Sequence, residues 1–227
     1  MVDIEKEIQS KKDPIQAKIL SRFFKTGKGQ YGEGDIFLGV TVPTLRIIVK
    51  KYSKDISLKD VQKLLNSKIH EYRLTALLIL VEKYKEDKEL IYNTYIRNFI
   101  NINNWNLVDL TAPKIMGDFL KDKNRDILYS LATSNNLWEK RISIVATFAF
   151  IKDNDFKDTL KISEILLKDE HDLIHKAVGW MLREVGKRNK DLEKEFLDKY
   201  YRIMPRTMLR YSIEKFDPKE KEFYMKK

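Results

Sequence analysis

The sequence predicts an all-α protein, specifically a curved α-solenoid of degenerate, antiparallel helix pairs of the HEAT or armadillo type. Apolar residues recur at helical spacing along the chain, and no segment alternates polar and apolar residues between hairpin turns. The 8 glycines and 5 prolines are too few for the many turns of an all-β protein. Helix pairs recur roughly every 35–40 residues, which is the period typical of such repeats.

Capping residues and prolines mark the helices expected in the first half of the chain. Pro43 suits a first helical turn, where a missing N–H is tolerated, and Ser57 is a typical cap for the helix after it. Asn103 and Asn104 offer caps to a helix that begins near Trp105. The helices expected before that point cover residues 15–24, 44–52, 57 onward, 70–84 and 88–100.

The second half continues the series of helices and polar linkers. Pro113 is expected to kink the helix that carries Trp105, because proline removes a backbone donor. Arg202, Arg206 and Arg210 recur every four residues, which indicates one cationic helix face that is either solvated or suited to phosphates. Further helices are expected over residues 126–132, 138–151, 158–167, 173–185, 192–200 and 205–216, with linkers at 85–87, 121–124 and 152–155.

Length and composition narrow the class of protein. The 227 residues suffice for one sizeable core, and we expect a single HEAT-like domain over residues 1–227. The formal net charge of +10 favours a nucleic acid or an anionic membrane surface as partner. No run reaches the ~18 apolar residues of a membrane span, and residues 1–8 do not read as a secretory signal. The lack of cysteine fits a reducing compartment, so we expect a cytoplasmic protein, nucleoid-associated if bacterial.

Two patterns resemble ligand sites but favour plainer interpretations. The segment from Gly27 to Gly32 matches the glycine spacing of a dinucleotide loop, yet no βαβ unit surrounds it, so we expect a connecting loop. His171 and His175 are spaced like zinc ligands on a helix, but the chain holds one other histidine and no cysteine. Capping or surface hydrogen bonding explains them better, and we expect neither a metal nor another cofactor.

The most informative stretch places Asp109 one helical turn beyond Trp105. Positions four apart share a helix face, so the indole and the carboxylate would border the same small volume. Either residue alone is unremarkable, but Leu107 and Val108 already supply the apolar anchoring of this helix. A basic protein that attracts a polyanion has reason to place an anion there if positive charge develops during a reaction. Asp118 is a further, weaker candidate in the same region.

A second tryptophan lies among cations. Lys176, Trp180, Arg183 and Lys187 share one helix face, which suits nucleic acid, although a tryptophan at this spacing is more often a core residue. Arg141 lies in register with apolar positions of its helix, so it requires either a structural ion pair or a functional anion. The opposite side of the Trp180 helix supplies a core stripe of Ile174, Val178, Met181, Leu182 and Val185.

On these residues the chain resembles the AlkD-type DNA alkylation repair family, the HEAT-like alkylpurine DNA glycosylases. The resemblance rests on the segments 104–109, 138–141 and 176–184, in that order and spacing, and it extends over nearly the whole chain. The family often has Trp-Trp-Asp-x-Val-Asp in the first segment, whereas this chain has Asn104 before Trp105 and Asn106 in place of the first acid. These departures bear on lesion preference and rate more than on the class of reaction.

The resemblance implies hydrolysis of the N-glycosidic bond of N3- or N7-alkylated purines in duplex DNA, the first step of base excision repair. Asp109 would stabilise an oxocarbenium-like sugar and orient or deprotonate water, and Trp105 and Trp180 would pack on the deoxyribose. The resemblance also implies that the lesion stays stacked, unlike the flipped base of most glycosylases. The residues implied or expected to grip the DNA backbone are Lys140, Arg141, Lys176, Arg183 and Lys187.

Two other classes of function remain open from the sequence. A non-catalytic HEAT-repeat protein that binds bent or branched DNA would share the basic features but would not need Asp109. A protein-binding scaffold would prefer acidic or extended peptides and would be indifferent to DNA. In each case a monomer is the simplest expectation, with no membrane and no metal as partner.

Overall fold

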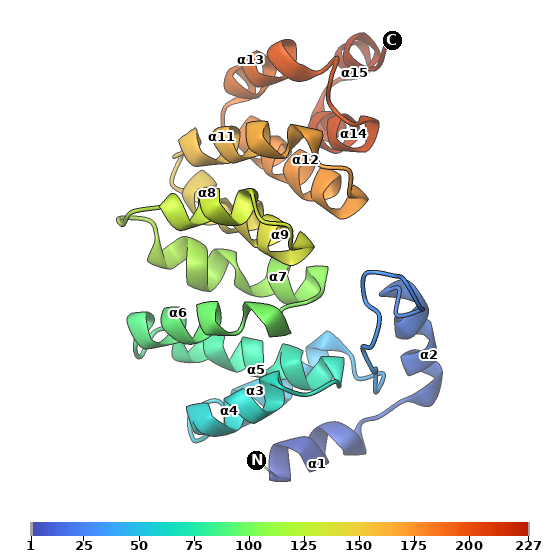
Figure 1. The fold of residues 1–227 in the computed structure, drawn as a ribbon, viewed down its shortest axis with the longest axis vertical. Coiled ribbons are helices and arrows are strands. Elements are labelled where there is room, and N and C mark those ends of the chain that lie inside the picture. The colour runs from blue at the N-terminus through green and yellow to red at the C-terminus, as the bar shows by residue number, and fades with distance from the viewer. Residues whose placement is uncertain (1, 227) are drawn as a thin grey trace. The chain divides into compact units, whose positions relative to one another are not determined.

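The computed structural model describes residues 2–226 and is all-α, as the sequence predicts (Figure 1). These residues contain no β-strand, only one isolated bridge between Ile36 and Ile69. The chain divides into two compact units, Met1–Thr111 and Ala112–Lys227, and a single domain over 1–227 stays a prediction. Within the described part, no helix has the length and apolar character needed to span a membrane.

The first unit is built around helix α5 (His70–Lys83). Residues 70–80 of α5 are all buried, and the helix packs against α3, α4 and α7. The predicted cap of α4 is confirmed, since the Ser57 hydroxyl oxygen accepts the backbone N–H of Asp60 at 3.2 Å. The other helices of this unit are α1 (Val2–Ser10), α2 (Pro14–Phe23), α3 (Val42–Tyr52), α4 (Leu58–Leu65), α6 (Lys88–Arg97), the 3₁₀ turn Phe99–Asn101 and α7 (Trp105–Thr111).

The long connection between α2 and α3 is anchored to α5. The buried Glu71 carboxylate accepts the backbone N–H groups of Leu38, Gly39 and Val40 at 2.8–3.3 Å. Gly39 has φ +88°, and a Cβ there would lie 2.1 Å from the carbonyl oxygen of Asp13, so only glycine fits. The connection therefore lies against the first turn of α5, where its side chains reach the start of α7.

The second unit is built around α12 (Asp172–Gly186), which packs against α9, α11, α13 and α14. The predicted apolar stripe of this helix is confirmed, because all five of its residues are buried. The other elements are the π-helical segment Pro113–Gly117, α8 (Asp126–Ala132), α9 (Leu137–Ala146), α10 (Phe148–Lys152), α11 (Lys157–Ile165), the 3₁₀ turn Leu166–Lys168, α13 (Lys190–Tyr200), α14 (Arg206–Ser212), the 3₁₀ turn Ile213–Lys215 and α15 (Pro218–Met225).

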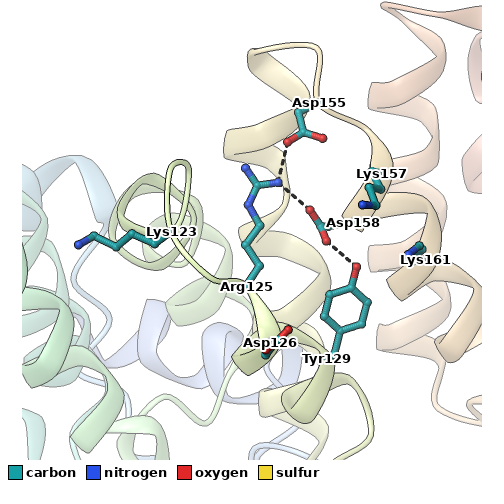
Figure 2. A pocket seen from close by; sticks show the side chains of 8 residues that line it. All are labelled: Lys123, Arg125, Asp126, Tyr129, Asp155, Lys157, Asp158 and Lys161. Carbon is teal, nitrogen blue, oxygen red and sulfur yellow. Dashed lines mark hydrogen bonds and ion pairs between the residues drawn. The ribbon is translucent and has the colours of Figure 1, made fainter.

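A hollow of about 600 Å³ beside α8 and α11 contains a closed polar network (Figure 2). Nη1 of Arg125 donates to Asp155 and Asp158 at 2.6 Å each, and the Tyr129 hydroxyl donates to Asp158 at 2.5 Å. The guanidinium also lies 3.8 Å above the ring centroid of Phe150. Because the arginine and the tyrosine engage both carboxylates, the network ties the start of α8 to the α10–α11 connection and needs no ligand.

Several helix boundaries differ from the sequence expectation. The helix expected over 138–151 is broken at Thr147, whose hydroxyl donates to the carbonyl of Ile144 at 2.7 Å. The stretches 88–100, 158–167 and 205–216 finish in 3₁₀ turns rather than continuing as α-helix. Pro113 does more than kink the preceding helix: α7 ends before it, and a π-helical segment begins at the proline.

The proposed arginine face at the end of the chain is wrong. Arg202 lies in the turn after α13, whereas Arg206 and Arg210 belong to α14. Pro205, with ψ 137°, precedes the first residue of α14 and separates the two segments. The four-residue spacing therefore does not align the three side chains on one helix.

The buried Glu193 of α13 predicts a measurable dependence of stability on pH. Burial raises the pKa of this carboxyl to about 8, and its Oε1 lacks a hydrogen-bond partner. The folded state therefore holds a proton that the unfolded state releases above pH 4.5, so stability falls as pH rises from about 4.5 to about 8. We expect Glu193→Gln to stabilise the protein at pH 7, by on the order of 2–3 kcal/mol, and to flatten this slope. Urea titrations of the wild type and the variant at pH 5, 7 and 8.5 measure the free energy of unfolding. Parallel dependences on pH in the two proteins would contradict this role of Glu193.

Candidate functional site

Helix α7 begins at Trp105, directly after Asn104, one of the two caps that the sequence offers. The side-chain oxygen of Asn104 accepts the backbone N–H of Trp105 at 2.9 Å. Trp105 and Asp109, one turn apart, are both half-buried, whereas Leu107 and Val108 are fully buried. The core thus holds α7 through its aliphatic residues and leaves the indole and the carboxylate on a partly accessible face.

The indole of Trp105 is fixed by the end of α2. Its ring stacks on Phe24 with centroids 5.0 Å apart and planes 20° apart, and it meets Phe23 edge-on at 5.8 Å. Phe24 is buried, but Phe23 is 60% exposed. Two consecutive aromatic residues therefore hold one edge and one face of the tryptophan.

Behind the start of α7 lies a buried polar cluster that the sequence analysis missed. Asp35 is its centre: Nδ1 of His70 lies 2.9 Å from one carboxylate oxygen, and Nη2 of Arg73 lies 2.6 Å from the other. Asn103 donates to Asp35 at 3.1 Å and accepts from Arg73 at 3.0 Å. Nδ2 of Asn106 lies 3.0 Å from Nε2 of His70. The two residues that flank the Asn104–Trp105 pair are thus both tied to this cluster.

The charges of the cluster perturb its central carboxyl. Burial alone would raise the pKa of Asp35, but the hydrogen bond from His70 and the positive charge of Arg73 together lower this pKa below its ordinary value of 3.8. Nearby, burial raises the pKa of Tyr95, and the negative charge of Asp109 adds to this increase. Asp109 therefore acts electrostatically on the buried hydroxyl, which hydrogen-bonds Thr111 at 3.0 Å.

Helix α12 presents the second tryptophan among charged residues, as the sequence predicts. Trp180 is half-buried; its Nε1 donates to Glu184 at 3.2 Å and its ring lies 5.9 Å from that of Phe148. The predicted cations on this face are all in ion pairs in the structure. Lys187 contacts Glu184 at 2.7 Å, and Arg183 contacts Glu214. Likewise, Lys176 lies 2.6 Å from Asp172.

Lys140 and Arg141 of α9 hold the segment that leads into α12. Arg141 is 5% exposed, and its Nη1 donates to the backbone carbonyl of Leu173 at 2.5 Å. Nζ of Lys140 lies 2.5 Å from the Asp169 carboxylate, which also accepts the backbone N–H of His171 at 2.8 Å. Both side chains therefore position the first turn of the Trp180 helix, and their role in DNA binding stays a prediction.

The Gly179 position next to Trp180 is occupied by glycine for a steric reason, which gives a testable prediction. A Cβ there would lie 2.4 Å from the carbonyl oxygen of Met208 and 2.5 Å from Cβ of Tyr211, both on α14. We expect Gly179→Ala to force α12 away from α14 and to lower stability by about 1–3 kcal/mol, measured by denaturant unfolding.

The same substitution at Gly27 is a matched control. A Cβ there meets only the flexible end of the Gln30 side chain, so we expect a change within about 0.5 kcal/mol. Equal stabilities of the two alanine variants would contradict the packing argument.

The other candidate sites take the plainer roles. Nδ1 of His171 accepts the backbone N–H of Leu173 at 3.1 Å and so caps α12, while Nε2 of His175 lies 2.5 Å from the carbonyl oxygen of Asp169. No cluster of three or more His, Asp or Glu residues suited to a metal ion occurs in residues 2–226. The segment Gly27–Gly32 is a loop between helices, as expected.

The fold is one already seen in a solved structure. A structure described as a predicted DNA alkylation repair enzyme from Enterococcus faecalis matches with a TM-score of 0.71 and 16% sequence identity, over 92% of this chain and 98% of that chain. At that identity the match establishes the fold alone. A search among curated proteins finds no match.

Family assignment comes from the sequence itself. The family model for DNA alkylation repair enzymes matches residues 4–216. The chain therefore belongs to the DNA alkylation repair enzyme family, which implies an enzyme that acts on DNA. The matched range includes α7 and α12 with both tryptophans, and it ends before α15.

Proposed function

We propose that the protein is a DNA glycosylase that hydrolyses the N-glycosidic bond of N3- and N7-alkylated purines in duplex DNA. The observation that carries the proposal is the accessible face of α7, where a half-buried carboxylate lies one turn from a stacked indole. Family membership supports an enzyme of DNA alkylation repair, and a carboxylate on this face is suited to stabilise a developing cation.

In the proposed reaction, alkylation makes the purine a cationic leaving group, and the sugar gains positive charge as the C1′–N bond stretches. Asp109 stabilises this charge and orients or deprotonates the water that attacks C1′; the purine leaves with the bonding electron pair. Trp105 and Trp180 pack on the deoxyribose, where their ring faces favour a cation. The proposal needs no cofactor or metal.

DNA is held through its backbone in this proposal, and the lesion remains stacked. Salt bridges such as Lys187–Glu184 exchange for phosphate contacts when DNA arrives, because exposed ion pairs contribute little stability. Counterion release then makes binding fall steeply with salt. We propose that the DNA phosphates are contacted by Lys140, Arg141, Lys176, Arg183 and Lys187. We also propose that the protein is cytoplasmic and monomeric.

The test is incubation of the protein with duplex DNA treated with a methylating agent, followed by chromatography of the released bases. We expect 3-methyladenine and 7-methylguanine in the soluble fraction and none from undamaged DNA. Salt-sensitive DNA binding without base release would support a non-catalytic protein that binds bent or branched DNA. Indifference to DNA would support a protein-binding scaffold.

A further inference from the structure

Two independent sets of contacts join His70 to Trp105. The first is polar: Asp35 lies 2.9 Å from Nδ1 of His70, and Asn106, the residue after Trp105, lies 3.0 Å from Nε2. The second is a stack of four rings. His70 lies on Phe37 with centroids 4.4 Å apart, Phe37 lies 5.1 Å from Phe24, and Phe24 lies 5.0 Å from Trp105, with planes 15–22° apart throughout. Because Trp105 and Asn106 are adjacent in the chain, the polar contacts and the ring stack both connect His70 to the start of α7.

Both ring nitrogens of His70 are engaged. The Asp35 carboxylate only accepts, so the Nδ1–H of His70 donates to it. The side-chain amide of Asn106 lies against Nε2, and His70 is 1% exposed. Arg73 balances the charge of Asp35, so the ring is held at both nitrogens inside a buried polar cluster.

Asn106 is itself buried, at 7% exposed, and its contact with Nε2 links the first turn of α7 to the imidazole. The other charged groups around this ring are Asp35, Arg73 on the next turn of α5, and the adjacent Glu71, which binds the 38–40 backbone.

We propose that His70 is a positioning residue for Trp105, holding the indole at its angle through the ring stack on one side and through Asn106 on the other. This role in catalysis rests on the proposed glycosylase function. His70 is too deeply buried to touch DNA itself. It acts by keeping the indole where the sugar must pack, and a misplacement of about 1 Å at such a site costs up to about a hundredfold in rate.

Three variants separate positioning from stability. His70→Gln keeps polar atoms for Asp35 and Asn106 but removes the ring from the stack, and Asn106→Ala removes the polar link but keeps the stack. Tyr72→Phe is the matched control: it removes a buried hydroxyl of the same helix, which accepts from Gln9 at 3.0 Å. For each variant we measure the melting temperature, the rate of base release in a single turnover, and the DNA affinity. We also record the indole ¹H–¹⁵N NMR signal of Trp105, which the Trp105→Phe variant assigns.

We expect His70→Gln and Asn106→Ala to shift the Trp105 signal and to slow base release by about tenfold to a hundredfold, with DNA affinity within about twofold. Tyr72→Phe should lower the melting temperature without moving the signal. A Trp105 signal unchanged in both test variants, or rates that follow only the melting temperatures, would overturn the proposal.

The experiment distinguishes a failure of the proposed glycosylase function from a failure of the positioning role of His70. If the wild type releases no base, the glycosylase function fails, and the Trp105 signal alone decides whether His70 positions the indole. If the wild type releases base and the two test variants match Tyr72→Phe in rate and signal, the positioning role fails while the glycosylase function stands.

Discussion

Asp109→Asn is expected to slow the release of alkylated purines by roughly a thousandfold while leaving duplex affinity nearly unchanged. The substitution keeps the size of the side chain and removes its charge. A close pair of opposite charges contributes about 4 kcal/mol at an effective dielectric constant of about 20, and that energy corresponds to roughly a thousandfold in rate. The sugar bears positive charge mainly in the transition state, so the loss falls on the chemical step rather than on binding. Single-turnover assays on methylated duplex DNA measure the rate.

The matched control is Asp118→Asn, which makes the same chemical change at a half-buried carboxylate paired with Lys121 at 3.6 Å. We expect this variant to release bases at the wild-type rate. A wild-type rate in Asp109→Asn would remove the catalytic role of that carboxylate. Loss of DNA affinity in step with the rate would make Asp109 a residue for binding or folding instead.

Local patterns in the sequence predict the fold well. The stripe from Ile174 to Val185 is buried as expected, Ser57 caps its helix, and the α8 boundaries of 126–132 are correct. Helices with few apolar residues were not predicted. Helix α1 is fixed by the buried pair Ile4 and Ile8, too short a pattern to identify a helix. Helix α15 begins at a capping box of Asp217 and Glu220, a signal in the sequence that could have located it.

The candidate site likewise contains residues that local sequence patterns predict and residues that they do not. Spacing four residues apart predicts that Trp105 and Asp109 share a face of α7, because helix periodicity is local information. No such period links Asp35, His70 and Asn106, which lie on three separate segments and meet only in the folded chain. Taken singly, none of these three residues has a pattern around it that indicates a buried cluster. The available signal was the group His70, Glu71 and Arg73 at the start of a helix whose next residues, 74–81, are mostly apolar.

Asp35→Asn is expected to lower the free energy of unfolding by about 3–5 kcal/mol, because it leaves the guanidinium of Arg73 buried without its counter-charge. That loss corresponds to a melting temperature lower by roughly 10 °C for a chain of this size. The pKa of Asp35 is lowered on folding, so its contribution is complete above pH 3.8 and is lost as pH falls through the lower pKa of the folded state. The difference between wild type and variant should therefore be constant from pH 5 to 7 and shrink below about pH 4.

A half-buried acid whose partner is exposed provides the contrast that assigns this loss to burial. Glu7 also pairs with a cation, Lys51 at 2.6 Å, but the lysine side chain is 60% exposed. Water screens such a pair, so Glu7→Gln should leave the melting temperature near that of the wild type. A drop in Glu7→Gln as large as in Asp35→Asn would show that loss of any acid destabilises this basic protein through net charge. A small effect in both would mean that Arg73 finds water or Asn103 as sufficient compensation, and the cluster would then fix the start of α7 without stabilising the fold.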